Sequence, residues 1–155
     1  MLAGIAAAGL LPIVPAQAEP IWPGGPDIPG VPALIPPLPV VAPCSSEARA
    51  CLRLGTNEAW LMRDGKVTYG PTQISHGRPG YETPPGVFAV FHKNEHHWST
   101  LHNSPMPYAV FFNGDIGFHE GPVQEASHGC IRMTHDGAST FFRELQVGDV
   151  VEAVP

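Results

Sequence analysis

Residues 58–69 read EAWLMRDGKVTY. The two halves of this stretch carry the apolar, aromatic and β-branched side chains that are common in strands, and Asp64-Gly65 separates them. An Asp-Gly pair between two such runs is a strong signal for a two-residue hairpin turn. The stretch therefore predicts two antiparallel strands, residues 58–63 and 66–69.

Further short strands are expected on the C-terminal side of this hairpin. Residues 71–75 predict an edge or bulged strand, because Pro71 has no backbone N–H to donate to a neighbouring strand. The apolar runs VFAVF (87–91) and YAVFF (108–112) predict a core strand and a further strand. Asn113-Gly114 then indicates a second two-residue hairpin turn.

A single helix is expected over about residues 136–145, with Thr134 or Asp136 as its N-cap. Its apolar side consists of Phe141, Phe142 and Leu145. Residues 150–154, VVEAV, predict a closing strand. Many short strands with turn signals and one helix indicate a mainly β fold, a β-sandwich or mixed β-barrel, and argue against a βαβ fold.

The composition divides the 155 residues into three parts. Residues 1–18 are apolar and end in Ala-Gln-Ala, which predicts a signal-like leader and contact with the membrane only during export. Residues 19–43 are proline-rich and predict an extended linker. Residues 44–155 carry nearly all of the charge and are long enough for one folded domain. The net charge of −6 argues against a nucleic-acid partner, which would require a basic patch.

The cysteines also favour a location outside the cytoplasm, in the cell wall, the periplasm or the medium. Cys44 and Cys51 enclose a short loop and are expected to form a disulfide in an oxidising compartment. Cys130 is then left as an unpaired thiol, which is unusual in an exported protein. A bridge between Cys130 and one of the other two cysteines is the alternative.

Cys130 lies in the stretch SHGCIR, residues 127–132. A nucleophilic thiol needs a base, and a neighbouring imidazolium or guanidinium lowers its pKa. Gly129 would let a substrate carbonyl approach the backbone, where N–H groups can stabilise an oxyanion. The alternative is that Cys130 is a buried structural thiol, because cysteine is among the most buried residue types.

Two histidines could act as the base. His119 follows an expected strand, and the loop after it is long enough to bring its imidazole across to Cys130 from a neighbouring strand. His128 is two residues from Cys130, beside the nucleophile, so His119 is the preferred base and His128 is expected to orient the loop or contact substrate. Residues 92–106 predict a polar surface loop whose histidines take no part in catalysis: His92, His96, His97 and His102. Zinc ligation by the histidines is an alternative, but neither H-E-x-x-H nor C-x-x-C occurs, and no metal or other cofactor is expected.

With the upstream Phe118-His119-Glu120-Gly121, the SHGCIR stretch resembles the catalytic domain of L,D-transpeptidases, the YkuD-type family. That family carries a histidine followed by an S/T-H-G-C-x-R/N signature. ISHG (74–77) with TPPGVF (83–88) resembles a second family motif, and Met106-Pro107-Tyr108 and the closing VGDVV (147–151) are weaker matches. The resemblance covers about residues 50–154.

The resemblance implies a function and a set of roles. Cys130 would attack the bond before the terminal D-alanine of a peptidoglycan tetrapeptide stem, with His119 as general base and acid. The Glu120 carbonyl would orient His119, and the Gly129 and Cys130 N–H groups would bind the oxyanion. A second stem would resolve the acyl-enzyme as a 3→3 crosslink, and carbapenems are expected to acylate the same sulfur. Substrate would contact four further residues: Tyr108, Ser127, His128 and Arg132.

Four alternatives remain at this stage. Water as acceptor would make the protein an L,D-carboxypeptidase, and a protein amine would make it a wall-anchoring transferase. A third alternative is a non-catalytic module that binds the cell wall, and a metal hydrolase is the weakest hypothesis.

Overall fold

The computed structural model describes residues 19–20, 27–28 and 38–155. The leader predicted for residues 1–18 and most of the predicted linker lie outside the described residues. Within the linker, β1 (Glu19–Pro20) and β2 (Asp27–Ile28) pair as two short antiparallel strands. Residues 40–155 form a compact unit in which Ala42 is buried, so this unit begins slightly before the predicted residue 44. No helix in the described residues is long and apolar enough to cross a membrane.

The compact unit is built on one curled sheet, whose strands in sheet order are β6-β11-β3-β4-β5-β10-β9-β8-β7. Within residues 38–155 a single α-helix, α1 (His135–Glu144), accompanies the sheet. The strands are β3 (Ala50–Arg53), β4 (Glu58–Arg63), β5 (Lys66–Ser75), β6 (Gly86–Ala89), β7 (His92–Ser99), β8 (Ser104–Asn113), β9 (Ile116–Glu120), β10 (Ile131–Met133) and β11 (Val150–Val154). A short 3₁₀ helix, η1 (Leu54–Thr56), connects β3 to β4. The mainly β fold predicted from the sequence is confirmed.

The hairpin predicted for residues 58–69 is formed by β4 and β5. Arg63 pairs with Lys66, and the two turn residues between them, Asp64 and Gly65, have φ angles of 50° and 75°. Positive φ at both central positions is what a tight hairpin turn requires, and Asp and Gly tolerate it. The predicted turn is therefore confirmed.

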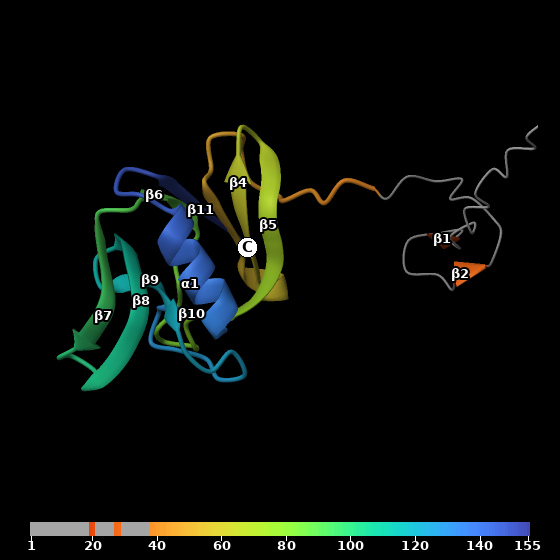
Figure 1. Ribbon diagram of the computed structural model, residues 1–155. Coiled ribbons are helices and arrows are strands. Elements are labelled where there is room, and N and C mark those ends of the chain that lie inside the picture. The colour runs from red at the N-terminus through yellow and green to blue at the C-terminus, as the bar shows by residue number, and fades with distance from the viewer. Residues whose placement is uncertain (1–18, 21–26, 29–37) are drawn as a thin grey trace, which may run out of the picture. The chain divides into compact units, whose positions relative to one another are not determined.

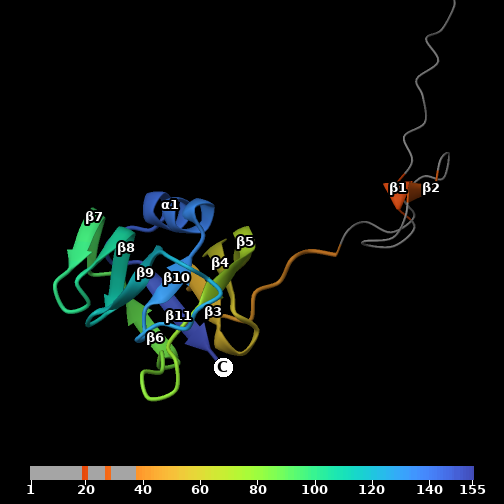
Figure 2. The same ribbon diagram turned by 90° about the horizontal axis from the view of Figure 1, so that it is seen from below.

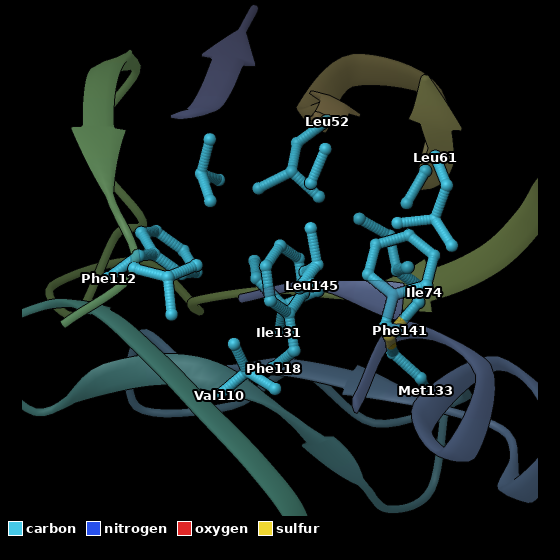
Figure 3. Close-up of a cluster of buried hydrophobic side chains, with 14 of the residues drawn as sticks. Leu52, Leu61, Ile74, Val110, Phe112, Phe118, Ile131, Met133, Phe141 and Leu145 are labelled. Carbon is cyan, nitrogen blue, oxygen red and sulfur yellow. The ribbon is translucent and has the colours of Figure 1, made fainter. Parts of the chain in front are cut away.

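The sheet curls until its two ends approach each other (Figures 1 and 2). β6 contacts β8, and the Phe91 N–H donates to the Phe111 carbonyl at 3.0 Å. The main core fills the space enclosed by the curled sheet, where side chains of β3 and β4 meet those of β8, β9 and β10 (Figure 3). The labelled members are Leu52, Leu61, Ile74, Val110, Phe112, Phe118, Ile131, Met133, Phe141 and Leu145.

The α-helix closes this core from one side. α1 lies against β8, β9 and β10, and its residues Ala138 and Phe141 are completely buried. Leu145, which follows the helix, is also completely buried. The helix begins after Thr134, whose Oγ accepts a hydrogen bond from the Gly137 N–H at 3.2 Å. Of the two N-caps considered from the sequence, the structure selects Thr134.

Of the two possibilities predicted for residues 71–75, the structure selects the bulged strand: β5 lies inside the sheet, and the register shift between Ala59 and Leu61 of β4 accommodates Pro71 as a bulge. Two other local predictions were wrong. The strand predicted over residues 87–91 is an edge strand, with Val87 69% exposed, and contributes Phe88 to the core. Residues 92–99 are not a loop: they form β7, the other edge strand, most of whose side chains are exposed, although Ser99 is buried.

The N-terminal segment of the compact unit covers the outer face of β3 and β4. Ala42 and Ala48 pack there against Trp60 and Met62 in a second, smaller core. The predicted disulfide between Cys44 and Cys51 is present at this position, and it excludes a bridge to Cys130. The disulfide thus ties the entry of the chain to β3.

Candidate active site

The site is built on two neighbouring parallel strands, β9 and β10 (Figure 2). Phe118 pairs with Ile131, and both side chains are completely buried in the main core. Because side chains alternate along a strand, the next pair, His119 and Arg132, faces the opposite side of the sheet. Cys130 directly precedes β10 and faces the same side as Arg132. The sheet therefore presents the predicted base and nucleophile on one face, on adjacent strands.

An open pocket of about 220 Å³ contains both groups. Its lining comes from β9, β10, the loop before β10, the turn between β7 and β8, and the first residues of β8. The residues are His102, Ser104, Met106, His119, Ser127, His128, Cys130 and Arg132. A thiol and an imidazole thus share a cavity that a peptide carbonyl can enter, which is the arrangement that acyl transfer through a thioester needs.

His119 is held in a defined orientation. Its side chain is largely buried, with 8% of the residue exposed, and its Nδ1 lies 2.8 Å from the Glu120 carbonyl oxygen. A carbonyl only accepts, so Nδ1 carries the proton and donates it. Nε2 is then the unprotonated nitrogen, available to accept a proton. The Glu120 carbonyl occupies the position that the sequence analysis assigned to it.

Burial keeps both reactive groups uncharged near neutral pH. It lowers the pKa of His119, and Arg132, His97 and His102 lower it further, while the hydrogen bond to Glu120 acts in the opposite direction. Burial raises the pKa of the Cys130 thiol, against the Gly117 N–H and the Arg132 charge, which lower it. The cost of desolvating the anion exceeds the effect of these two groups, and the negative charge of Asp115 raises the pKa of the thiol further.

Ser127 organises the backbone around the nucleophile. Its buried Oγ donates to the Cys130 carbonyl at 2.6 Å and accepts from the Gly129 N–H at 3.0 Å. The Gly129 N–H, predicted to bind an oxyanion, is thus already engaged by Ser127. Of the two predicted backbone donors, the Cys130 N–H is the remaining candidate.

Gly129 is required by the backbone path into the nucleophile. Its φ of 121° lies in the region that L side chains rarely adopt, and a Cβ there would come within 3.3 Å of the Ile116 side chain. The Gly129 carbonyl accepts from Thr83 Oγ1 at 2.7 Å, and Thr83 Oγ1 accepts from the Gly77 N–H at 3.0 Å. The second motif identified in the sequence, residues 74–88, thereby supports the loop that carries Cys130.

One wall of the pocket is a stack of rings around His128. His102 stacks on the His128 ring with a centroid separation of 4.9 Å, and Tyr81 packs edge-on against it at 4.9 Å. Arg78 lies 3.0 Å from His128 Nε2 and over the Tyr81 ring. His128 is thereby tied into the pocket wall by Arg78, Tyr81 and His102.

Arg132 and Tyr108, two predicted substrate contacts, have different surroundings. Arg132 lines the pocket and is held by the Glu125 carbonyl at 3.2 Å, with the Glu125 carboxylate 3.9 Å away. Tyr108 does not line this pocket: its ring packs edge-on against Phe142 and His135 on α1. Tyr108 therefore packs on the helix outside this pocket, and its contact with substrate stays a prediction.

The contribution of the β7–β8 hairpin to the site was not predicted. His102, Ser104 and Met106 line the pocket, although His102 was assigned to a polar surface loop without a role. Met106 occurs in the weak third motif, which was the one available signal. Because the sequence of β7 is polar, the β7–β8 hairpin was not predicted, and neither was the position of these three residues in the pocket.

Comparison with known proteins agrees with this geometry. The profile of the L,D-transpeptidase catalytic domain, YkuD, matches residues 47–152. An L,D-transpeptidase structure from Stackebrandtia nassauensis is 28% identical, with a TM-score of 0.67 over 76% of this chain and 59% of its own. An L,D-transpeptidase mutant from Enterococcus faecium is 26% identical, with a TM-score of 0.61 over 70% of this chain and 50% of its own.

A third structure, an LD transpeptidase in complex with imipenem, is 25% identical, with a TM-score of 0.61 over 68% of this chain and 57% of its own. The present chain therefore spans between 50% and 59% of the length of these three structures. No curated protein matches the chain.

Proposed function

The chain belongs to the L,D-transpeptidase catalytic domain family, and we propose that it is an exported cysteine transpeptidase of peptidoglycan. In this proposal it cleaves the bond before the terminal D-alanine of a tetrapeptide donor stem and forms a 3→3 crosslink. The observation that carries the proposal is the shared pocket of Cys130 and His119, with the His119 Nδ1 bonded to the Glu120 carbonyl.

The first half-reaction forms a thioester on Cys130. The Nε2 of neutral His119 takes the thiol proton as the sulfur attacks the donor carbonyl, so that charge develops only as the new S–C bond forms. This concerted transfer suits a pair whose members are both uncharged at rest. The C–N bond then breaks, and His119 returns the proton to the amine of the departing D-alanine.

The second half-reaction transfers the acyl group to the acceptor. The amine of a second stem attacks the thioester, the S–C bond breaks, and a new amide bond forms. His119 takes the proton that the attacking nitrogen loses, and the sulfur leaves as a thiolate that is protonated again. The Cys130 N–H supports the oxyanion in both halves.

Export is supported by two features. The Cys44–Cys51 disulfide is typical of proteins that reside in an oxidising compartment. Residues 1–18 have the composition and the Ala-Gln-Ala ending of a secretory signal. Peptidoglycan lies outside the cytoplasm, so the proposed substrate and the proposed location agree.

The test is incubation with muropeptides that contain tetrapeptide stems, followed by mass spectrometry. We expect a crosslinked dimer with the loss of one D-alanine, and no dimer with Cys130→Ala. Cys44 cannot replace Cys130 because it is held in the disulfide. Dimer formation by Cys130→Ala at the wild-type rate would reject Cys130 as the nucleophile.

A covalent probe gives an independent readout of the same sulfur. The imipenem complex of a related structure suggests that a carbapenem will add to Cys130, which intact-mass measurement detects as one adduct per chain. We expect His119→Ala to slow this addition by about 10²- to 10⁴-fold, the usual contribution of a general base. Addition at the wild-type rate in His119→Ala would exclude His119 as the base.

A further inference from the structure

Arg78 contacts His128 from a turn outside the active-site pocket. It begins the tight turn of residues 78–81, in which the Tyr81 N–H donates to the Arg78 carbonyl at 2.8 Å. Its Nη2 lies 3.0 Å from His128 Nε2. His128 is among the described residues that line the pocket in front of Cys130, and Arg78 is not. Any influence of Arg78 on that pocket therefore passes through the His128 ring.

Backbone hydrogen bonds hold this contact in place. The Arg78 N–H donates to the Ser127 carbonyl at 3.0 Å, and Gly77 and Ser127 form an isolated parallel bridge. Ser127 directly precedes His128 in the chain. The separation of Arg78 and His128 is therefore set by the backbone as well as by the two side chains.

The contact determines which ring nitrogen of His128 carries the proton. A guanidinium has five N–H donors and no acceptor, so His128 Nε2 accepts and is unprotonated. The ion pairs formed within residues 38–155 do not include Arg78, so no carboxylate there competes for its donors. A neutral imidazole has one proton, and in His128 that proton is left on Nδ1.

The surroundings of His128 also keep the ring neutral. Desolvation lowers the pKa of His128, and the positive charges of Arg78, His102 and Arg132 lower it further. The Tyr81 ring packs edge-on against the same imidazole and brings no negative charge. A second cation beside the Arg78 guanidinium is therefore unfavourable near neutral pH.

The two pocket histidines consequently have different capacities. His119 carries its proton on Nδ1 and keeps Nε2 free to accept one. The Nε2 of His128 is already occupied by Arg78, so His128 loses that hydrogen bond if it takes a proton there. Its Nδ1–H can only donate. His128 is thus suited to donate a hydrogen bond to a neutral acceptor, such as the carbonyl oxygen of a peptide, and not to act as a base.

We propose that Arg78 is a positioning residue that fixes His128 as an Nδ1–H donor for a carbonyl oxygen of the donor stem. The inference rests on the proposed transpeptidase function and adds a residue outside the pocket to its substrate recognition. Arg78 acts through His128 and does not itself touch the substrate.

The first experiment determines the tautomer directly. Two-bond proton–nitrogen correlation spectra of isotope-labelled protein distinguish a protonated ring nitrogen from an unprotonated one, and His128→Gln identifies the His128 signals by their loss. We expect the Nδ1–H form in the wild-type protein and in Arg78→Lys, because lysine also only donates. Arg78→Glu should convert the neutral ring to the Nε2–H form, because a carboxylate only accepts. Protonation of wild-type His128 on Nε2, or an unchanged tautomer in Arg78→Glu, would overturn the proposal.

The second experiment measures the affinity for a tetrapeptide muropeptide by calorimetry, with Cys130→Ala present in every protein so that no turnover occurs. At about pH 8 we expect Arg78→Glu to weaken binding by about 10-fold, because the unprotonated Nδ1 faces the carbonyl oxygen, and Arg78→Lys to retain most of the affinity. When the pH is lowered to about 6, the His128 ring of Arg78→Glu gains a proton on Nδ1 and should bind again. A loss that does not respond to pH would show a merely structural role and overturn the proposal.

Arg63→Glu is the matched control, because it makes the same charge change at an exposed arginine that ends β4. His102 and Arg132 are the same in all the proteins, so their effect on His128 cancels in the comparison. Equal affinities of Arg78→Glu and Arg63→Glu at high pH would overturn the role of Arg78. Failure of the muropeptide to bind even with Arg78 intact would instead overturn the proposed function, which the tautomer spectra do not depend on.

Discussion

His119 and Cys130 illustrate how burial determines the chemistry of a residue. Both are partly or largely buried, and burial moves their pKa values apart, down for the imidazole and up for the thiol. The pair therefore rests as a neutral imidazole and a neutral thiol. A resting ion pair would require the opposite shifts. Proton transfer then accompanies attack and does not precede it.

The charge of Arg132 acts on both groups in the same direction, which gives a prediction about pH. Arg132 lowers the pKa of His119 and that of Cys130, so Arg132→Gln should raise both. Acylation by a carbapenem requires neutral His119, so its rate falls as pH drops through the His119 pKa. We expect this acid limb below pH 6.5 in the wild-type protein and at a higher pH in Arg132→Gln. A shift to lower pH, measured by stopped-flow acylation, would contradict this account.

Ser127 gives a second prediction at the same scale. Ser127→Ala leaves the Gly129 N–H and the Cys130 carbonyl without their shared partner and loosens the backbone that aims the sulfur. We expect the acylation rate to fall by about tenfold or more with little change in substrate affinity, because Ser127 acts on the nucleophile and not on binding. Ser127→Thr keeps the hydroxyl and should restore most of the rate. A change confined to KM would instead indicate substrate contact.

The site could be predicted from sequence only where its residues follow one another along the chain. Cys130, Ser127 and Gly129 are neighbours, and the chain order of His119 and Cys130 suggested paired strands, so these residues were found. His102 could not be found, because its place in the pocket depends on the register of β7 against β8. The hydrogen bond from the Gly129 N–H to Ser127 could not be predicted either, because it depends on the orientation of the Ser127 hydroxyl.

At the scale of elements, α1 closes the core and follows β10 directly, so its first turn also fixes the end of the nucleophile strand. Thr134 begins the helix, and its Oγ satisfies the Gly137 N–H. We expect Thr134→Ala to lower the free energy of unfolding by about 1 kcal/mol and Thr134→Ser to restore it. Urea denaturation of the three proteins measures this. Equal midpoints for the alanine and serine variants would show that the cap does not contribute.

Strands were predicted well where apolar residues alternate or a tight turn separates them, as in β4, β5 and β11. β7 was missed because an edge strand can be polar on both faces, as HKNEHHWS is, and then gives no apolar signal. β6 was placed in the core because its run is apolar, although half of its side chains face outward. Whether a strand lies at the edge depends on the order of the sheet, which local sequence does not contain.

At the scale of the molecule, the disulfide joins the N-terminal segment to β3 and stabilises the cover over Trp60 and Met62. The loop between Cys44 and Cys51 is short, and the chain-entropy estimate for it is about 2.5 kcal/mol. We expect reduction to lower the melting temperature and to raise the number of reactive thiols in the unfolded chain from one to three. An unchanged melting temperature after complete reduction, checked by thiol labelling, would show that the bridge is not stabilising.

The place of β11 has a consequence for the order in which the domain is made. β11 lies between β3 and β6, parallel to β3, and Val151 pairs with both Ala50 and Phe88. During synthesis β3 emerges early, yet one of its two neighbours is translated about a hundred residues later. The sheet therefore cannot be completed on the ribosome until residue 154 has been added. Until β11 has been made, β3 lacks one of its two neighbouring strands and β6 lacks its only neighbour in the described sheet.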